Sequence, residues 1–205
     1  MKLSALFLPL SLANDRFTPK CDIGTFILEE APEANSAEYG SSLDHEWGSC
    51  VMQGHRNHME DRVITQSYFN NLFSLYIVFD GHGGDTVVKY AKKEFADFLL
   101  QRNMDMFTKF KDNMSLYDPA HIKDVLEESF PIYDRQLMHK EDIHRALLDP
   151  KVRSTSGCTC TGVIVTHKHI ITFNTGDSRT LLLDDGLVRS KVGVSPIWQI
   201  VLYGI

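Results

Sequence analysis

A buried strand that ends in a carboxylate and several glycines constrains this chain most. The apolar run 75–79 is followed at once by residues 80–84, which read Asp-Gly-His-Gly-Gly. A short apolar run bounded by glycines indicates a buried strand. Such a strand would hold Asp80 rigidly at its carboxyl end, and the glycines would let the backbone approach a bound ion or phosphate closely. Carboxylate and carbonyl oxygens suit Mg²⁺ or Mn²⁺. The alternative is an ordinary strand followed by a glycine turn.

A second polar segment connects two predicted strands, 48–51 and 63–67. It places Arg56, Glu60 and Asp61 in one tight connection. An arginine side chain suits a phosphate because its planar guanidinium group donates two parallel hydrogen bonds. Acidic side chains near the same cleft suit a divalent cation. The segment therefore favours a site that handles both a phosphate and a metal ion.

A third segment is predicted to be a β-hairpin. Its strands are 156–166 and 170–179, and a short polar turn separates them. The second strand is predicted to end in Gly-Asp-Ser-Arg at 176–179, which places Asp177 at a strand end as well. Aspartates that converge near a cleft again indicate divalent metal.

Taken in this order, the three segments resemble the metal-dependent protein serine/threonine phosphatases of the PP2C (PPM) family. The resemblance extends from Gly48 to about Gly186. It implies an α+β fold, a central antiparallel β-sandwich flanked by helices. The matching residues are Met52-Gln-Gly, Arg56, Met59-Glu-Asp, Phe79-Asp-Gly-His-Gly-Gly, Ser156-Gly, Thr159 and Gly176-Asp-Ser-Arg.

The resemblance implies two or more Mn²⁺ or Mg²⁺ ions and a set of oxygen ligands for them. Asp80 would bridge two ions, the Gly81 carbonyl would bind one of them, and Glu60 would hold one ion. Asp177 matches a position that contributes to a weaker, additional metal site. A metal-activated water would then hydrolyse phosphoserine or phosphothreonine, while the ions neutralise developing charge. No cysteine nucleophile is needed.

The resemblance also implies roles for three further polar side chains. Arg56 would bind the substrate phosphate, and His82 would protonate the leaving oxygen as general acid. Asp61 would form hydrogen bonds in the shell of residues around the ions. The implied partner is a phosphorylated protein, and a monomer is expected.

The end of the sequence departs from the family pattern. The family domain continues past the hairpin and supplies two more metal-ligating aspartates, which are not identifiable here. Asp184-Asp185-Gly186 is interpreted as a hairpin turn, where Asp-Gly is favoured. The apolar tail 192–205 does not resemble the family's continuation. We therefore expect a truncated domain with weakened metal binding. The alternative function is a catalytically impaired phosphatase fold that acts as a binding or regulatory protein.

The chain is divided by these observations into three parts. Residues 1–44 are a leader or irregular extension, 45–191 the amino-terminal portion of a PP2C-like domain, and 192–205 a divergent tail. A strand at Thr25–Leu28 is considered within the leader. Residues 1–13 resemble a short secretory signal; otherwise the expected location is cytoplasmic or nuclear.

Two helices are predicted between the β-rich segments. Residues 85–102 form an amphipathic pattern. A second helix is predicted to begin with Asp118 as N-cap and Pro119 at its first position. Pro131 is predicted to kink or end it. Residues 134–148 are compatible with a renewed helix, whereas 140–156 is interpreted as a mobile loop.

Charge and cysteine content exclude several classes of protein. The net charge of −6 argues against broad binding to nucleic acid or anionic membranes. No apolar run is long enough to span a bilayer as a helix. The four cysteines are not spaced as a zinc site or a disulfide framework. They are interpreted as buried small hydrophobic residues, in a reducing compartment.

Overall fold

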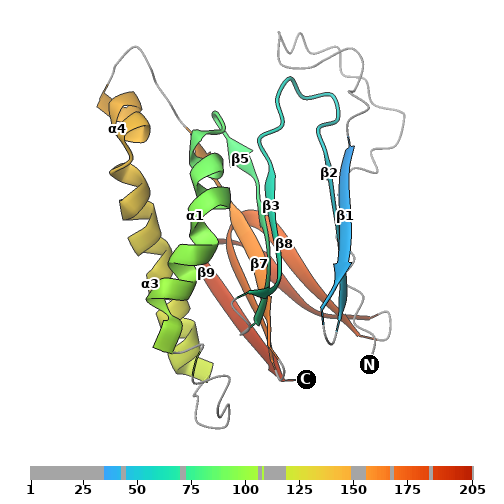
Figure 1. The fold of residues 1–205 in the computed structure, drawn as a ribbon. Helices are drawn as coiled ribbons and strands as arrows, with labels where there is room; N and C mark the ends of the chain where they lie inside the picture. Colours follow the sequence, from blue (N-terminus) through green and yellow to red (C-terminus); the bar gives the residue numbers. More distant parts are fainter. Residues whose placement is uncertain are drawn as a thin grey trace. The chain divides into compact units, whose positions relative to one another are not determined.

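The computed structural model shows two compact units along the chain (Figure 1). The first unit is 1–59 and the second is 60–205. The residues that the structure describes are 35–42, 45–69, 73–105, 108, 119–148, 156–166, 169–184 and 187–204.

The first unit contains a two-stranded antiparallel ladder. Strand β1 (Asn35–Ser41) pairs with β2 (Glu46–Met52) along its whole length. The burial of β2 alternates from residue to residue, as expected for a strand with one covered face. The strand predicted at 48–51 is confirmed, whereas the one considered at Thr25–Leu28 lies outside the described residues.

The second unit is built on a five-stranded antiparallel sheet. The strands, in sheet order, are β3 (Arg62–Phe69), β4 (Phe73–Phe79), β7 (Cys160–Val165), β8 (His169–Asp184) and β9 (Leu187–Gly204). Every residue of β4 except Val78 is buried. A largely apolar strand suits this position because β4 is paired along both edges and side chains on both of its faces are buried. The strand that precedes Asp80 is thus a buried strand within the sheet, as predicted.

Helices pack against this sheet and complete the core (Figure 1). They are α1 (Thr86–Arg102), α3 (Pro119–Met138) and α4 (Glu141–Leu148). The Phe95 ring of α1 contacts the rings of Phe79, Phe130 and Tyr133, with centroids 5.0 to 5.9 Å apart. Aromatic contacts therefore join both long helices to β4. The predicted α+β class is confirmed, with antiparallel strands and flanking helices. The packing of two sheets into a sandwich stays a prediction.

Of the two outcomes predicted for Pro131, an end of the helix is wrong, and a kink stays a prediction. Helix α3 continues through Pro131 to Met138. A proline inside a helix costs about 3 kcal/mol. Burying one leucine or phenylalanine side chain contributes about 1.5–3 kcal/mol. The helix buries several such side chains on both sides of the proline, which are Leu126, Phe130, Tyr133 and Leu137. Their combined burial outweighs the cost of the proline.

The interpretation of 140–156 as a loop is wrong for its first half, which is helix α4. Residues 149–155 lie outside the described residues. Two contacts tie this region to α1. The Tyr90 hydroxyl donates to Asp142 Oδ1 at 2.8 Å, and Lys140 Nζ donates to Glu94 Oε2 at 2.6 Å. Ile143 is buried in the core. The renewed helix considered for 134–148 is thus present as α4 in its last part. The tertiary contacts stabilise a helix that is too short to be stable by itself.

The prediction that the second hairpin strand ends at 176–179 is also wrong. Strand β8 continues to Asp184, and its pairing with β9 shifts register around Gly176. Gly176 has φ +93°, which favours glycine. Asp177 therefore lies in a bulge within a long strand and not at a strand end. Asp184 pairs with Leu187, as the predicted hairpin at 185–186 requires.

The tail 192–205 continues the sheet up to residue 204. As part of β9, it pairs with β8 from Thr180, which lies opposite Val192, to His169, which lies opposite Gly204. In the part of the chain that the structure describes, no helix has both the length and the hydrophobicity needed to cross a membrane.

Candidate active site

The site is built around Asp80, which lies directly after β4. The next two residues form β5 (Gly81–His82), which pairs with β6 (Gly157–Cys158). The Thr159 amide donates to the Asp80 carbonyl at 2.9 Å, and the Asp80 amide donates to Thr159 Oγ1 at 3.3 Å. The Asp80 residue itself is exposed. Its backbone is therefore fixed while its carboxylate faces solvent.

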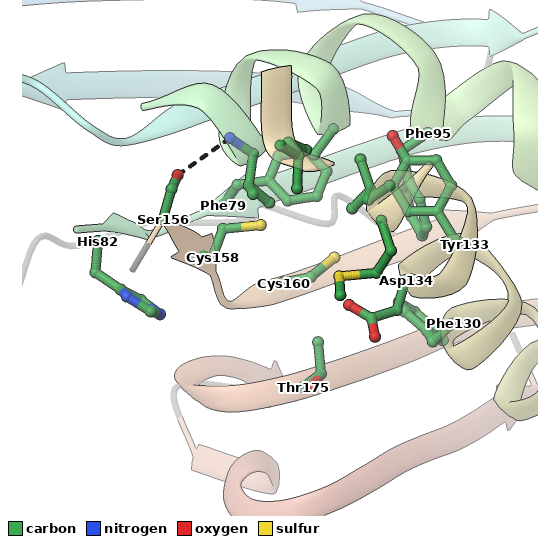
Figure 2. A pocket seen from close by; sticks show the side chains of 16 residues that line it. Phe79, His82, Phe95, Phe130, Tyr133, Asp134, Ser156, Cys158, Cys160 and Thr175 are labelled. Atoms are coloured by element: carbon green, nitrogen blue, oxygen red, sulfur yellow. Dashed lines mark hydrogen bonds between the residues drawn. The ribbon is translucent and has the colours of Figure 1, made fainter. Parts of the chain in front are cut away.

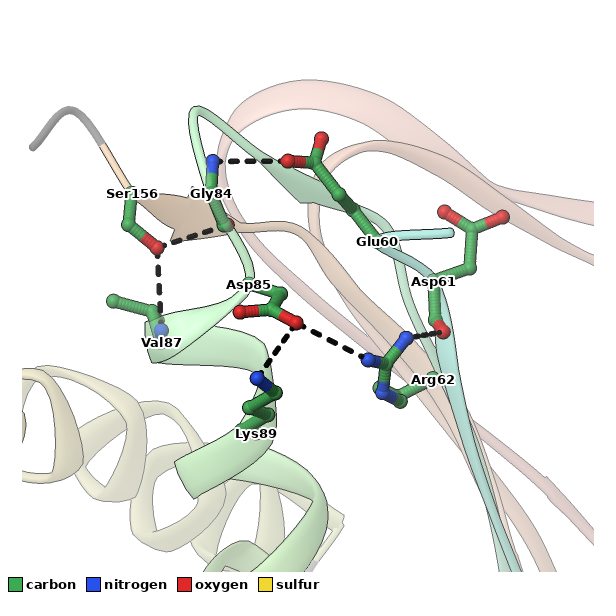
Figure 3. A network of polar contacts seen from close by, with 8 residues as sticks. All are labelled: Glu60, Asp61, Arg62, Gly84, Asp85, Val87, Lys89 and Ser156. Carbon is green, nitrogen blue, oxygen red and sulfur yellow. Dashed lines mark hydrogen bonds and ion pairs between the residues drawn. The ribbon is translucent and has the colours of Figure 1, made fainter. Parts of the chain in front are cut away.

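Glu60 lies against the glycine-rich loop that follows Asp80. A Cβ atom at Gly81 would be 2.4 Å from the Glu60 carbonyl oxygen, so only glycine fits there. The Gly84 amide donates to Glu60 Oε1 at 3.0 Å (Figure 3). The structure thus brings Glu60 together with the Asp-Gly-His-Gly-Gly segment, as the sequence predicted.

Asp61 follows Glu60 and is half-buried. Its carbonyl accepts a hydrogen bond from Arg62 Nη1 at 2.7 Å. Arg62 also pairs with Asp85 at 3.5 Å, and Asp85 pairs with Lys89 at 2.8 Å (Figure 3). The hydrogen bond from Lys89 lowers the pKa of the Asp85 carboxyl group below its usual value. These ion pairs hold the start of α1 beside Asp61 and Arg62.

His82 is exposed, and its ring lies over Gly157. A Cβ atom at residue 157 would be 2.7 Å from His82 Cε1. A glycine at this position therefore makes room for the imidazole ring. This contact explains why the Ser-Gly motif has a glycine at residue 157.

Asp177 is exposed in the β8 bulge, and Thr159 connects the bulge to Asp80. Thr159 Oγ1 lies 2.6 Å from Ser178 Oγ, while its backbone pairs with Asp80. A Cβ atom at Gly176 would be 2.7 Å from Thr159 Cγ2. From the sequence, Thr159 was noted only as a motif residue, and its contacts with both Asp80 and Ser178 were not predicted. Its place shortly after the Ser-Gly motif was the one sequence feature that could have indicated them.

Arg56 belongs to the first unit and is exposed. Its carbonyl accepts a hydrogen bond from Gln53 Nε2 at 2.6 Å. Gly54, with φ +61°, makes the turn between these two residues. The phosphate-binding role of Arg56 stays a prediction.

The oxygen donors of the second unit suit a hard divalent cation. Asp80, Glu60 and the Gly81 carbonyl supply carboxylate and carbonyl oxygens, the ligands that Mg²⁺ and Mn²⁺ prefer. Within the described residues, no three His, Cys, Asp or Glu side chains gather closely enough to form a metal site by themselves. The chemistry of the donors fits the predicted ions, and the complete ligand set stays a prediction.

A cavity of about 270 Å³ has His82 among its lining residues (Figure 2). Phe79, Phe95 and Phe130 form much of its apolar wall, together with Cys158 and Cys160. Burial raises the pKa of the Cys158 thiol to about 11 and that of Cys160 well above its usual value. Both thiols are therefore protonated near neutral pH and are poor nucleophiles.

The cysteine prediction holds only in part. Cys160 is buried and Cys158 is half-buried, but Cys50 is exposed on β2. Cys21 lies outside the described residues.

Sequence comparison identifies the family. The model of the protein phosphatase 2C family matches residues 45–192. The chain belongs to the protein phosphatase 2C family. The assignment made from the three motifs is confirmed, and all three motifs lie within the matched range.

Two relatives show how much of a family member this chain represents. It is 29% identical to protein phosphatase 1L of Bos taurus, over 84% of this chain and 42% of the relative. It is 35% identical to protein phosphatase 2C homolog 2 of Schizosaccharomyces pombe, over 78% of this chain and 40% of the relative. The chain thus spans less than half the length of these two curated relatives.

Similar solved structures include two phosphatase-type matches of modest score. Serine/threonine phosphatase Stp1 from Staphylococcus aureus matches with a TM-score of 0.42 and 19% identity, over 84% of this chain and 56% of that one. A bacterial serine phosphatase matches with a TM-score of 0.42 and 18% identity, over 78% of this chain and 53% of that one.

Proposed function

We propose that this protein hydrolyses phosphoserine and phosphothreonine esters in proteins and requires Mn²⁺ or Mg²⁺. The observation that supports this most is the close approach of Gly81 and Gly84 to Glu60. Glu60 and the segment that begins with Asp80 therefore lie together at the end of one buried strand. A hydrolase of this class needs oxygen ligands fixed beside an open substrate site. Asp80 is exposed at that strand end, where a protein substrate can reach it.

Asp80, Glu60 and the Gly81 carbonyl would hold the ions, and Asp177 would contribute to a weaker site. When bound, the ions would supply Lewis acidity for the phosphoryl group and lower the pKa of water. Hydrogen bonds within the protein would keep these ligands in place. Asp80 is held by Thr159, and Glu60 by Gly84.

His82 would donate the proton that the leaving serine or threonine oxygen requires. Because His82 is exposed, it can reach a substrate on another protein. Gly157 lies beneath its ring and has no side chain that would displace it. Arg56 would bind the phosphate through its guanidinium fork. The protonated thiols of Cys158 and Cys160 agree with a mechanism that does not use a cysteine nucleophile.

Hydrolysis of p-nitrophenyl phosphate by the 205-residue protein, with and without Mn²⁺, tests the proposal. We expect turnover that requires Mn²⁺ and is lost in Asp80→Asn. Asp97→Asn is the matched control, because Asp97 is an exposed carboxylate on α1. No turnover from a folded, monodisperse protein would reject the enzyme and favour the alternative, a binding or regulatory protein on a phosphatase fold.

A further inference from the structure

Ser156 bonds directly to residues 84 and 87, which lie far from it in the sequence, and Gly84 in turn bonds to Glu60 (Figure 3). Its hydroxyl oxygen accepts a hydrogen bond from the Val87 amide at 3.2 Å. The same hydroxyl donates to the Gly84 carbonyl at 3.0 Å. The Gly84 amide in turn donates to Glu60 Oε1 at 3.0 Å. A continuous chain of hydrogen bonds therefore runs from α1 through Ser156 and Gly84 to the Glu60 carboxylate.

The bond from Val87 makes Ser156 a cap for α1 from a distant segment. The first amides of a helix have no partner within the helix. Asp85 is the N-cap residue, but within the described residues its side chain makes no capping bond, because its carboxylate pairs with Lys89 and Arg62. Val87 is the second residue of α1, where a cap oxygen normally accepts. Ser156 supplies that oxygen.

The bonds on either side of Gly84 fix its backbone. Gly84 has φ +117°, a conformation that residues with side chains rarely adopt. Its carbonyl is held by Ser156 and its amide by Glu60. If the bond to the carbonyl is lost, this flexible residue can rotate, and the amide then no longer holds the carboxylate in one place.

We propose that Ser156 is a positioning residue for Glu60, acting through Gly84. The inference rests on the proposed function in one respect, which is that Glu60 binds a metal ion. Gly157, the next residue, lies under the His82 ring, so the same short segment supports both Glu60 and His82. Partners of this kind, which orient metal ligands, typically change metal affinity by about 10- to 100-fold when they are removed.

Two quantities test the proposal, the Mn²⁺ affinity measured by electron paramagnetic resonance and the exchange rate of the Gly84 amide in the metal-free protein. We expect Ser156→Ala to weaken Mn²⁺ binding about 10-fold and to speed Gly84 exchange. Ser156→Thr keeps the hydroxyl and should stay close to wild type on both readouts. Ser156→Cys keeps the side-chain shape without a good hydrogen-bonding group and should behave like Ser156→Ala, which provides a second test if the alanine variant does not fold.

Ser67→Ala is the matched control, because it removes a hydroxyl that lies 3.2 Å from the Tyr76 hydroxyl, away from the loop. It should change neither readout. If Ser156→Ala lowers only the melting temperature and leaves Mn²⁺ affinity and Gly84 exchange unchanged, the proposal is overturned. If wild type binds no Mn²⁺, the proposed function fails separately. Gly84 exchange then decides the positioning claim alone, and equal rates in wild type and Ser156→Ala would reject it.

Discussion

At the scale of single residues, glycines determine how closely the site can be assembled. Gly81 lets β5 approach the Glu60 backbone, and Gly157 makes room for the His82 ring. The sequence predicted that the glycines would allow close approach to an ion or phosphate. The structure shows that they also allow close approach to the protein's own chain. A Cβ at Gly81 would meet backbone, which cannot move away easily, whereas one at Gly157 would meet a side chain that can.

We predict that Gly81→Ala destabilises the protein by about 1–3 kcal/mol, because the added methyl group overpacks a site against backbone. The measurement is urea unfolding followed by circular dichroism. Gly48→Ala is the control, since a Cβ there would have its nearest neighbour at 3.8 Å, an ordinary contact. Unfolding midpoints that are the same for Gly81→Ala and wild type would contradict the close approach.

The cysteines give a prediction about pH. The pKa of Cys158 is raised to about 11 by burial, so the reactive thiolate is scarce below that pH and increases as pH rises toward it. Iodoacetamide should therefore modify exposed Cys50 at about pH 7.5 well before Cys158. Modification of Cys158 should accelerate between about pH 8 and about pH 10. Peptide mass spectrometry measures both rates, and equal rates near neutral pH would contradict the partial burial of Cys158 and its raised pKa.

At the scale of elements, the successes and failures of prediction follow from the range of the interactions. Strand β3 and helix α1 begin and end within two residues of their predicted bounds, because a local apolar pattern specifies them. Pro131 lies inside α3 although proline disfavours a helix interior, because the burial of the apolar face of α3 outweighs that cost. The continuation of β8 past Gly176 depends on pairing with β9, which a local pattern does not reveal.

Pro131 offers a test at this scale. Pro131→Ala restores an amide that can donate to the Glu127 carbonyl, four residues earlier in α3. We predict stabilisation by up to about 3 kcal/mol, measured as a higher urea midpoint with unchanged helix content. Lys123→Ala, at an exposed position of the same helix, should leave the midpoint nearly unchanged. A lower midpoint for Pro131→Ala would mean that the proline ring itself is needed for packing.

At the scale of the whole molecule, three motifs separated along the sequence were enough to identify the family. Each motif alone was ambiguous, but their order was specific, and the family model matches 45–192. The positions of Glu60 and Asp80 followed from motifs that the sequence displays directly. The roles of Ser156 and Thr159 did not, because each depends on hydrogen bonds between residues about 70 to 80 positions apart. Only folding brings those partners together.

The central claim is that the end of β4 binds a divalent cation through Asp80 and Glu60. A Mn²⁺ titration of the 205-residue protein, followed by electron paramagnetic resonance, tests it most directly. The account predicts saturable binding that Asp80→Asn and Glu60→Gln each weaken by at least about 10-fold, since even supporting residues have effects of that size. Asp97→Asn should bind as wild type does. Binding that is absent, or that is equal in wild type and Asp80→Asn, would contradict the claim.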